Sequence, residues 1–234
     1  MLNRIFAPLL FLGFAWFVVS NTDARTIIAG VAIFLIGMHY MENGFKLFSG
    51  GALETVLERF TGTTPRAILT GFLSTSVVQS SSLVSVIIIS FLSAELIGLT
   101  QAVGVVFGSN IGTTTTAWLV SAFGLKIKIS AYALPMLIFG VVMQFSRHVS
   151  YKGIGSVLIG LGFIFLGISY MKEGFETLKE GLNLAEYAMA GYAGVAVYII
   201  LGAIATVVIQ SSRATMAIII TGLATGPLDY INAL

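Results

Sequence analysis

Two short polar runs stand inside long apolar stretches of the chain, and they contain the residues whose types and spacing could do chemistry. The first run is Gln79 to Ser82, and the second is Gln210 to Arg213, 131 residues further on. At membrane depth, hydroxyl and amide groups must find partners or line a wet cavity, because lipid offers them no hydrogen bonds. The two runs therefore predict a binding site.

The sequence around the two runs is duplicated. With Gln79 aligned on Gln210, an isoleucine triplet and several hydroxyl residues coincide. A second pair of segments, residues 37–45 and 167–175, aligns at an offset of 130 and shares Tyr-Met and Gly-Phe. Related polar breaks in two apolar halves are a recognised sign of the binding site in transporters built from internal repeats.

The composition indicates a membrane protein. Of the 234 residues, 57% are hydrophobic and only 9% are charged, whereas a soluble domain carries about 25% charged residues. Apolar stretches of roughly 15 to 28 residues recur along the chain, which suits helices that span ~30 Å of hydrocarbon. The predicted fold class is an all-α polytopic membrane protein, a helical bundle rather than a barrel.

Charge and cysteine content exclude several function classes. The net charge is +2, from 12 basic and 10 acidic residues, so the chain carries no electrostatic footprint for nucleic acid. It has no cysteine, which excludes disulfides, a thiolate metal site and a cysteine nucleophile. The polar residues include no set of nucleophile, base and carboxylate, so we do not expect an enzyme.

The apolar pattern divides the chain into four parts. The first is an N-terminal helix with a polar turn, rather than a signal peptide, because no convincing small-x-small cleavage site follows it. The parts are residues 1–25 (this helix and turn), 26–128 (first repeat), 129–152 (a connecting helix) and 153–234 (second repeat).

Two segments of the first repeat bear on its topology. Residues 46–59 mix charged and apolar side chains at near-helical spacing, which predicts an amphipathic helix in the membrane interface, with residues 176–189 as its counterpart. Residues 66–93 form either one long tilted helix or two half-helices that meet near Gln79 in a re-entrant hairpin. The hairpin would make the two repeats inverted, and a full crossing would make them parallel. The loop charges are too evenly distributed to orient the chain.

Glycines and threonines interrupt the next apolar segment, residues 99–123. Gly104, Gly108 and Gly112 lie four residues apart, which on a helix would give a close-packing face. Asn110 and the four threonines that follow favour an unwound stretch whose carbonyls and hydroxyls face a cavity, and this is the form we predict. The counterpart of this stretch in the second repeat would fall beyond the last residue, so we expect that repeat to be truncated.

The paired Gln-Ser-Ser runs, together with Gly-Ser-Asn-Ile-Gly-Thr-Thr at residues 108–114, resemble the type II sodium/phosphate cotransporter family in its bacterial branch. The resemblance extends from about residue 29 to the end. It implies sodium-driven uptake of inorganic phosphate by a multi-pass protein of the bacterial inner (plasma) membrane. It also implies two inverted-topology repeats whose re-entrant helical hairpins bring the two runs together. The implied partners are phosphate, co-transported sodium and membrane lipid, with a homo-oligomer left open and no organic cofactor.

The resemblance implies a phosphate site formed by both runs. Phosphate needs donors on several sides, which helix N-termini, serine hydroxyls and a bidentate arginine can supply. Arg213 stands where the first run has Ser82, and it adds a fixed positive charge. The predicted substrate-binding residues are Gln79, Ser80, Ser81, Ser82, Gln210, Ser211, Ser212, Arg213, Asn110 and Thr113.

Sodium requires oxygen ligands, and none of the residues in the two runs is a carboxylate. The predicted sodium ligands are Thr75, Gln79, Ser85, Thr206, Gln210 and Thr215. We expect Ser90 and Ser93 only to bond the carbonyl four residues before each of them. The alternative functions are a sodium-coupled carrier of another oxyanion, a phosphate exporter, and a membrane scaffold whose small residues serve helix association.

Overall fold

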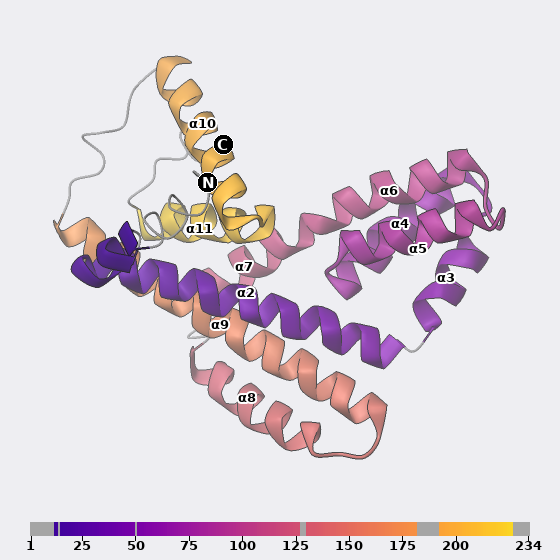
Figure 1. Ribbon diagram of the computed structural model, residues 1–234, viewed down its shortest axis with the longest axis horizontal. Helices are drawn as coiled ribbons and strands as arrows, with labels where there is room; N and C mark the ends of the chain where they lie inside the picture. Colours follow the sequence, from indigo (N-terminus) through magenta and orange to yellow (C-terminus); the bar gives the residue numbers. More distant parts are fainter. Residues whose placement is uncertain (1–11, 14, 50, 127–129, 182–191, 227–234) are drawn as a thin grey trace, which may run out of the picture. The chain divides into compact units, whose positions relative to one another are not determined.

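The computed structural model describes residues 12–13, 15–49, 51–126, 130–181 and 192–226 (Figure 1). Within these ranges all regular structure is helical and there is no strand, which confirms the predicted all-α class. The predicted N-terminal helix lies largely outside the described residues. In chain order the helices are α2 (Thr22–Ser49), α3 (Ala52–Phe60), α4 (Thr64–Val78), α5 (Ser81–Ser93), α6 (Leu99–Thr113), α7 (Thr115–Lys126), α8 (Ser130–Gln144), α9 (Val149–Gly181), α10 (Tyr192–Ile209) and α11 (Ser212–Thr225).

Two of the described helices are long and apolar enough to span a membrane. The qualifying stretches are Thr22–Leu47 in α2, with 26 residues, and Val149–Leu178 in α9, with 30 residues. A spanning helix needs about 20 apolar residues, and both stretches are longer than this. α5, α8, α10 and α11 are also apolar but shorter.

The chain forms two compact units. Unit 1 combines residues 1–34 with 166–234, and unit 2 is residues 35–165. Each unit therefore contains one half of α2 and one half of α9. The predicted first polar run belongs to unit 2, and the predicted second run belongs to unit 1.

α2 and α9 pack against each other through glycines that recur every seven residues. A Cβ atom on the first glycine of each pair would lie 2.7 Å from the carbonyl oxygen of the second, so no side chain separates the backbones. Rising residue numbers on α2 meet falling numbers on α9, and the two helices are therefore antiparallel. The pairs are Gly37–Gly160 and Gly44–Gly153 in unit 2, and Gly30–Gly167 in unit 1.

The predicted polar turn over residues 21–25 is wrong, because α2 already begins at Thr22. Asn21 caps the helix, since its Oδ1 accepts a hydrogen bond from the Ala24 N–H at 3.0 Å. An asparagine at this position satisfies one of the free amides of the first helical turn. Asn21 is the single non-helical residue between the helical residues 15–20 and α2.

The predicted amphipathic helix over residues 46–59 is also wrong at its start. α2 continues through Ser49, and α3 begins only at Ala52. Between them Gly51 has φ 88°, a left-handed conformation that glycine adopts without a steric cost. α3 buries Leu53 and Leu57, so its apolar face packs on the protein. In the predicted counterpart, residues 176–181 continue α9, and the remainder lies outside the described residues.

In unit 2, α4 and α6 pack with their backbones in contact. A Cβ atom on Gly71 would lie 2.2 Å from the Val105 carbonyl oxygen, and one on Gly108 would lie 1.9 Å from that of Ile68. Gly112, further along α6, reaches the level of Phe72 on α4. Rising residue numbers on α4 meet rising numbers on α6, so these two helices are parallel (Figure 1).

The parallel packing of α4 and α6 decides the path of residues 66–93. α5 joins the far end of α4 to the near end of α6, so it must run back along them (Figure 1). The segment is therefore a hairpin of two helices and not one long helix. That the hairpin enters and leaves on the same side of a membrane remains a prediction.

The predicted unwound stretch after Leu99 is wrong at its glycines. α6 is continuous from Leu99 to Thr113, and Gly104, Gly108 and Gly112 are buried within it. They form the close-packing face that was the alternative interpretation. The helix is interrupted only at Thr114, whose N–H bonds to the Ile111 carbonyl at 3.1 Å before α7 begins.

Candidate functional site

The two predicted binding runs share one backbone conformation. Gln79 and Gln210 both have φ 56°, in the left-handed region that side chains other than glycine rarely adopt. The Gln79 N–H bonds to the Thr75 carbonyl at 2.7 Å, and the Gln210 N–H bonds to the Thr206 carbonyl at 2.8 Å. The duplication seen in the sequence therefore extends to the local fold.

The glutamine side chains close the helices that precede them. Nε2 of Gln79 donates to the Ser76 carbonyl at 2.6 Å, and Nε2 of Gln210 donates to the Val207 carbonyl. The last carbonyls of a helix have no partner within it, so a folded-back amide satisfies one of them. Each glutamine thus caps the end of its helix with both its backbone and its side chain.

The serines that follow begin the next helices. Oγ of Ser80 accepts the Leu83 N–H, and Oγ of Ser211 accepts the Ala214 N–H, both at 3.3 Å. Serine is a preferred residue at the start of a helix because its hydroxyl oxygen satisfies an amide of the first turn. A Gln-Ser pair can therefore end one helix and start another within two residues.

Each break presents the N-terminus of a helix together with hydroxyls that bond to no described residue. Ser81 and Ser82 are the first residues of α5, and Ser212 is the first residue of α11. Within the described ranges no hydrogen bond joins these three hydroxyls to another group, and Ser82 and Ser212 are exposed. Free amides and the helix dipole favour a negative charge at such a position.

Arg213 is the second residue of α11 and is half-buried. A cation in the first turn of a helix is opposed by the helix dipole, which is positive at that end. A bound anion would offset this repulsion, so the position of Arg213 is compatible with the predicted role.

Gln79 is buried, and its side chain forms hydrogen bonds with a third helix, α7. It is 4% exposed, and its Nε2 donates to the Thr115 hydroxyl at 2.9 Å. The Thr116 hydroxyl in turn donates to Gln79 Oε1 at 2.6 Å. Hydrogen bonds therefore join the first break to the start of α7. Gln210, in the second break, is exposed instead. Thr115 and Thr116 were absent from the predicted site, although the run of four threonines was the signal for them.

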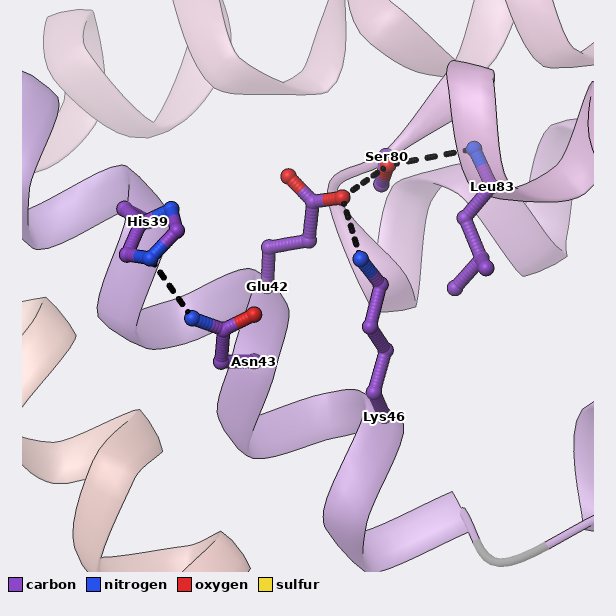
Figure 2. A network of polar contacts seen from close by, with 6 residues as sticks. All are labelled: His39, Glu42, Asn43, Lys46, Ser80 and Leu83. Atoms are coloured by element: carbon purple, nitrogen blue, oxygen red, sulfur yellow. Dashed lines mark hydrogen bonds and ion pairs between the residues drawn. The ribbon is translucent and has the colours of Figure 1, made fainter.

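Ser80 bonds to an acidic residue that sequence reasoning did not single out (Figure 2). Its hydroxyl donates to Glu42 Oε1 at 2.8 Å, and Lys46 Nζ lies 3.0 Å from the same carboxylate oxygen. Ser80 is completely buried. A charged residue within the apolar helix α2 was the available signal for Glu42, because charge at membrane depth defaults to a functional role.

The predicted sodium ligands fall into different surroundings. Thr75 is 1% exposed and its hydroxyl has no hydrogen-bond partner among the described residues, and the same is true of Ser109 on α6. Across the second break the hydroxyls of Thr206 and Thr215 lie 3.3 Å apart, so the fold brings these two predicted ligands together. The position aligned with Thr215 in the first hairpin is Val84, which cannot offer Thr75 a hydrogen bond.

The other predicted site residues lie on α5 and α6. Ser85 is half-buried on α5, and the Thr113 hydroxyl donates to the Ser109 carbonyl at 3.1 Å. Asn110 is exposed and lines a groove of about 290 Å³ between α5 and α6, where its neighbours are apolar.

Ser90 and Ser93 behave as predicted. Their hydroxyls donate to the carbonyls of Val86 and Ile89, four residues earlier, at 2.9 and 2.8 Å.

Comparison with known proteins gives the family. Residues 33–173 match the Na+/Pi-cotransporter family, and this range is more than half of the chain. The putative inorganic phosphate export protein YjbB of Salmonella typhimurium is 33% identical over 136 residues, which are 57% of this chain and 24% of that protein. YjbB of Escherichia coli K12 is 32% identical over the same shares. The uncharacterized protein YqeW of Bacillus subtilis is 27% identical over 130 residues, which are 56% of this chain and 41% of that protein.

The matched part is thus about a quarter of the length of the export proteins. No solved structure matches the chain. The family match contains the first Gln-Ser break, the hairpin around it and the glycine-packed α6. On this match, the chain is a membrane protein that belongs to the Na+/Pi-cotransporter family of transporters.

Proposed function

We propose that this chain forms part of a sodium-coupled symporter of inorganic phosphate, a multi-pass protein of the bacterial plasma membrane. The two Gln-Ser breaks together bind the anion. The observation that carries this proposal is that both breaks have the same conformation and present a new helix N-terminus with serine hydroxyls that bond to no described residue. Two inverted repeats and re-entrant hairpins are part of the proposal.

Phosphate suits the donors at these breaks. Its oxygens can accept hydrogen bonds from the first-turn amides of α5 and α11 and from the hydroxyls of Ser81, Ser82 and Ser212. Arg213 adds a planar, permanently charged donor that matches two phosphate oxygens. Gln79 and Gln210 contribute by shaping the breaks, since both side-chain amides cap the preceding helix.

Sodium binds beside the first break in this proposal. Thr75 and Ser109 each bury a hydroxyl oxygen without a hydrogen bond, and a buried polar group in that condition calls for an explanation. Thr75 Cβ lies 2.9 Å from the place that a Cβ on Gly112 would occupy, and Ser109 lies one turn earlier on α6. A sodium ion held here would attract the phosphate, because charges interact strongly in a low-dielectric site.

Export of phosphate is the second candidate. The relatives from Salmonella typhimurium and Escherichia coli are named putative inorganic phosphate export proteins, and this name favours an outward direction. The same site would serve both directions, since the ion gradients decide which way a coupled carrier runs.

Flux of labelled phosphate in proteoliposomes that contain the full-length protein tests the proposal. We expect flux under a sodium gradient that is lost when choline replaces sodium. Liposomes loaded inside or outside with phosphate distinguish export from uptake, and competition by sulfate and arsenate tests the choice of anion. Flux no greater than in empty liposomes, with sodium gradients of either direction, would refute the proposal.

Serine variants link the flux to the breaks. Ser82→Ala and Ser212→Ala should weaken phosphate binding by about tenfold or more, because a hydrogen bond to a charged group contributes about 1.5–3 kcal/mol. Ser90→Ala is the matched control, since its hydroxyl bonds to the Val86 carbonyl on an exposed face. Equal binding by all three variants would exclude the serines from the site.

A further inference from the structure

The first break already holds a negative charge, and that charge belongs to the protein. Glu42 projects from α2 toward the start of α5, and its Oε1 accepts the Ser80 hydroxyl at 2.8 Å (Figure 2). Ser80 is the residue that caps α5, so the carboxylate lies where the helix dipole and the first-turn amides favour an anion. Glu42 thus occupies the kind of position that the proposed function gives to phosphate.

The hydrogen bonds of Ser80 leave no second donor for a substrate. A hydroxyl carries one hydrogen, and Ser80 uses it on Glu42 while its oxygen accepts the Leu83 N–H. Ser80 is also completely buried, whereas the side chain of Glu42 is 25% exposed. An anion can reach the Ser80 hydrogen only after the carboxylate has moved aside.

The charge of Glu42 opposes phosphate binding, as its hydrogen bond to Ser80 does. A carboxylate beside the break repels an incoming phosphate, and Lys46, 3.0 Å from the same oxygen, offsets part of that charge. The position aligned with Glu42 in the second repeat holds Lys172, so an acid at this place belongs to the first half alone.

We propose that Glu42 sets the phosphate affinity of the first break by competing with phosphate for the Ser80 hydroxyl. This inference rests on the proposed function. Glu42 is a specificity-determining residue in this view: it admits only an anion that can displace a carboxylate. Lys46 has the opposite effect, because its ammonium group offsets the charge of Glu42 and so weakens the competition.

Binding of inorganic phosphate to the full-length protein in sodium-containing buffer tests the inference. Glu42→Gln removes the charge and keeps an acceptor oxygen for Ser80, so the fold keeps this contact. We expect it to bind phosphate about three- to tenfold more tightly, since a neutral acceptor holds a hydroxyl roughly half as strongly as a charged one. Lys46→Gln should bind more weakly than the wild type. Glu58→Gln removes a comparable charge from an exposed position on α3 and should bind like the wild type.

The sign of the change separates this role from a structural one. If Glu42 only supported the fold, Glu42→Gln would lower both the melting temperature and the affinity. Unchanged or weaker binding by Glu42→Gln, beside normal binding by the wild type, would overturn the inference and leave the proposed function intact. Absence of phosphate binding by the wild type would overturn both. In a Ser80→Ala background, Glu42→Gln should increase the phosphate affinity by a smaller factor. An equally large increase would contradict the proposal that Glu42 acts through the Ser80 hydroxyl.

Discussion

Gln79 and Gln210 cap their preceding helices in the same way, although Gln79 is buried and Gln210 is exposed. Both adopt a left-handed conformation, which costs about 1–2 kcal/mol for a residue other than glycine. Both offset this cost by capping the preceding helix with the side-chain amide. Only Gln79 also bonds to Thr115 and Thr116, because α7 begins beside the first break.

The difference in burial predicts a difference in stability. Gln79→Leu leaves the buried Thr116 hydroxyl and the Thr115 hydroxyl without the amide, and each lost partner costs about 1–3 kcal/mol. We therefore expect a loss of about 2–5 kcal/mol for Gln79→Leu and under about 1 kcal/mol for the exposed Gln210→Leu. Denaturant titration of the two variants in the same detergent measures both values. Equal losses would show that the contacts with α7 do not stabilise the break.

The unpartnered hydroxyls predict a specific effect on sodium dependence. Thr75→Val keeps the shape of the side chain and removes the proposed ligand, and Ser109→Ala removes the second one. Since neither hydroxyl has a partner to lose among the described residues, both variants should fold as stably as the wild type. Each should raise the sodium concentration at half-maximal phosphate flux several-fold. Ser90→Ala is the control, and an unchanged sodium dependence in Thr75→Val would remove this residue from the ion site.

At the scale of helices, the glycine-rich stretch shows where sequence reasoning was insufficient. Gly104, Gly108 and Gly112 are compatible both with an unwound chain and with a tightly packed helix, because a missing Cβ permits either. The choice depends on a partner helix, and α4 provides one through Gly71. The hairpin break was easier to anticipate, since Gln79 and Ser80 are themselves the groups that cap the two helix ends.

Close packing of α4 and α6 predicts a strong effect of adding one methyl group. Gly108→Ala would place a Cβ 1.9 Å from the Ile68 carbonyl oxygen, so the helices must separate. We expect a lower melting temperature and loss of phosphate binding. Gly202→Ala on α10 is the matched control, because no described atom of another element lies within 4 Å of its Cβ position. The control should be neutral or more stable by up to about 1 kcal/mol, given the higher helix propensity of alanine.

At the scale of the whole molecule, the hairpin and the paired long helices restrict the topology. α2 is one continuous helix with Arg25 near its start and Lys46 near its end, so a membrane-spanning α2 places these residues on opposite sides. α4 and α5 return toward the level from which they started, which supports the proposal that both ends of the hairpin face one side.

Site-directed labelling tests this topology directly, because the chain has no cysteine of its own. With a re-entrant hairpin, Arg66→Cys and Ser93→Cys should react with a membrane-impermeant reagent from the same side. Arg147→Cys, in the turn before α9, should react from that side too, and Arg25→Cys should react from the other. Labelling of positions 66 and 93 from opposite sides would replace the hairpin by a full crossing and make the repeats parallel.

The sequence by itself determined the helical class, the membrane character, the duplication and the two Gln-Ser breaks. These features depend on composition and on contacts between residues a few positions apart, such as Gln79 with Ser76 or Ser80 with Leu83. Only the tertiary structure decided that α6 is helical through its glycines and that Glu42 lies on Ser80. Both outcomes depend on which distant segment packs alongside. Neither the close approach of the α4 backbone to α6 nor a carboxylate 38 positions from Ser80 leaves a local pattern in the sequence.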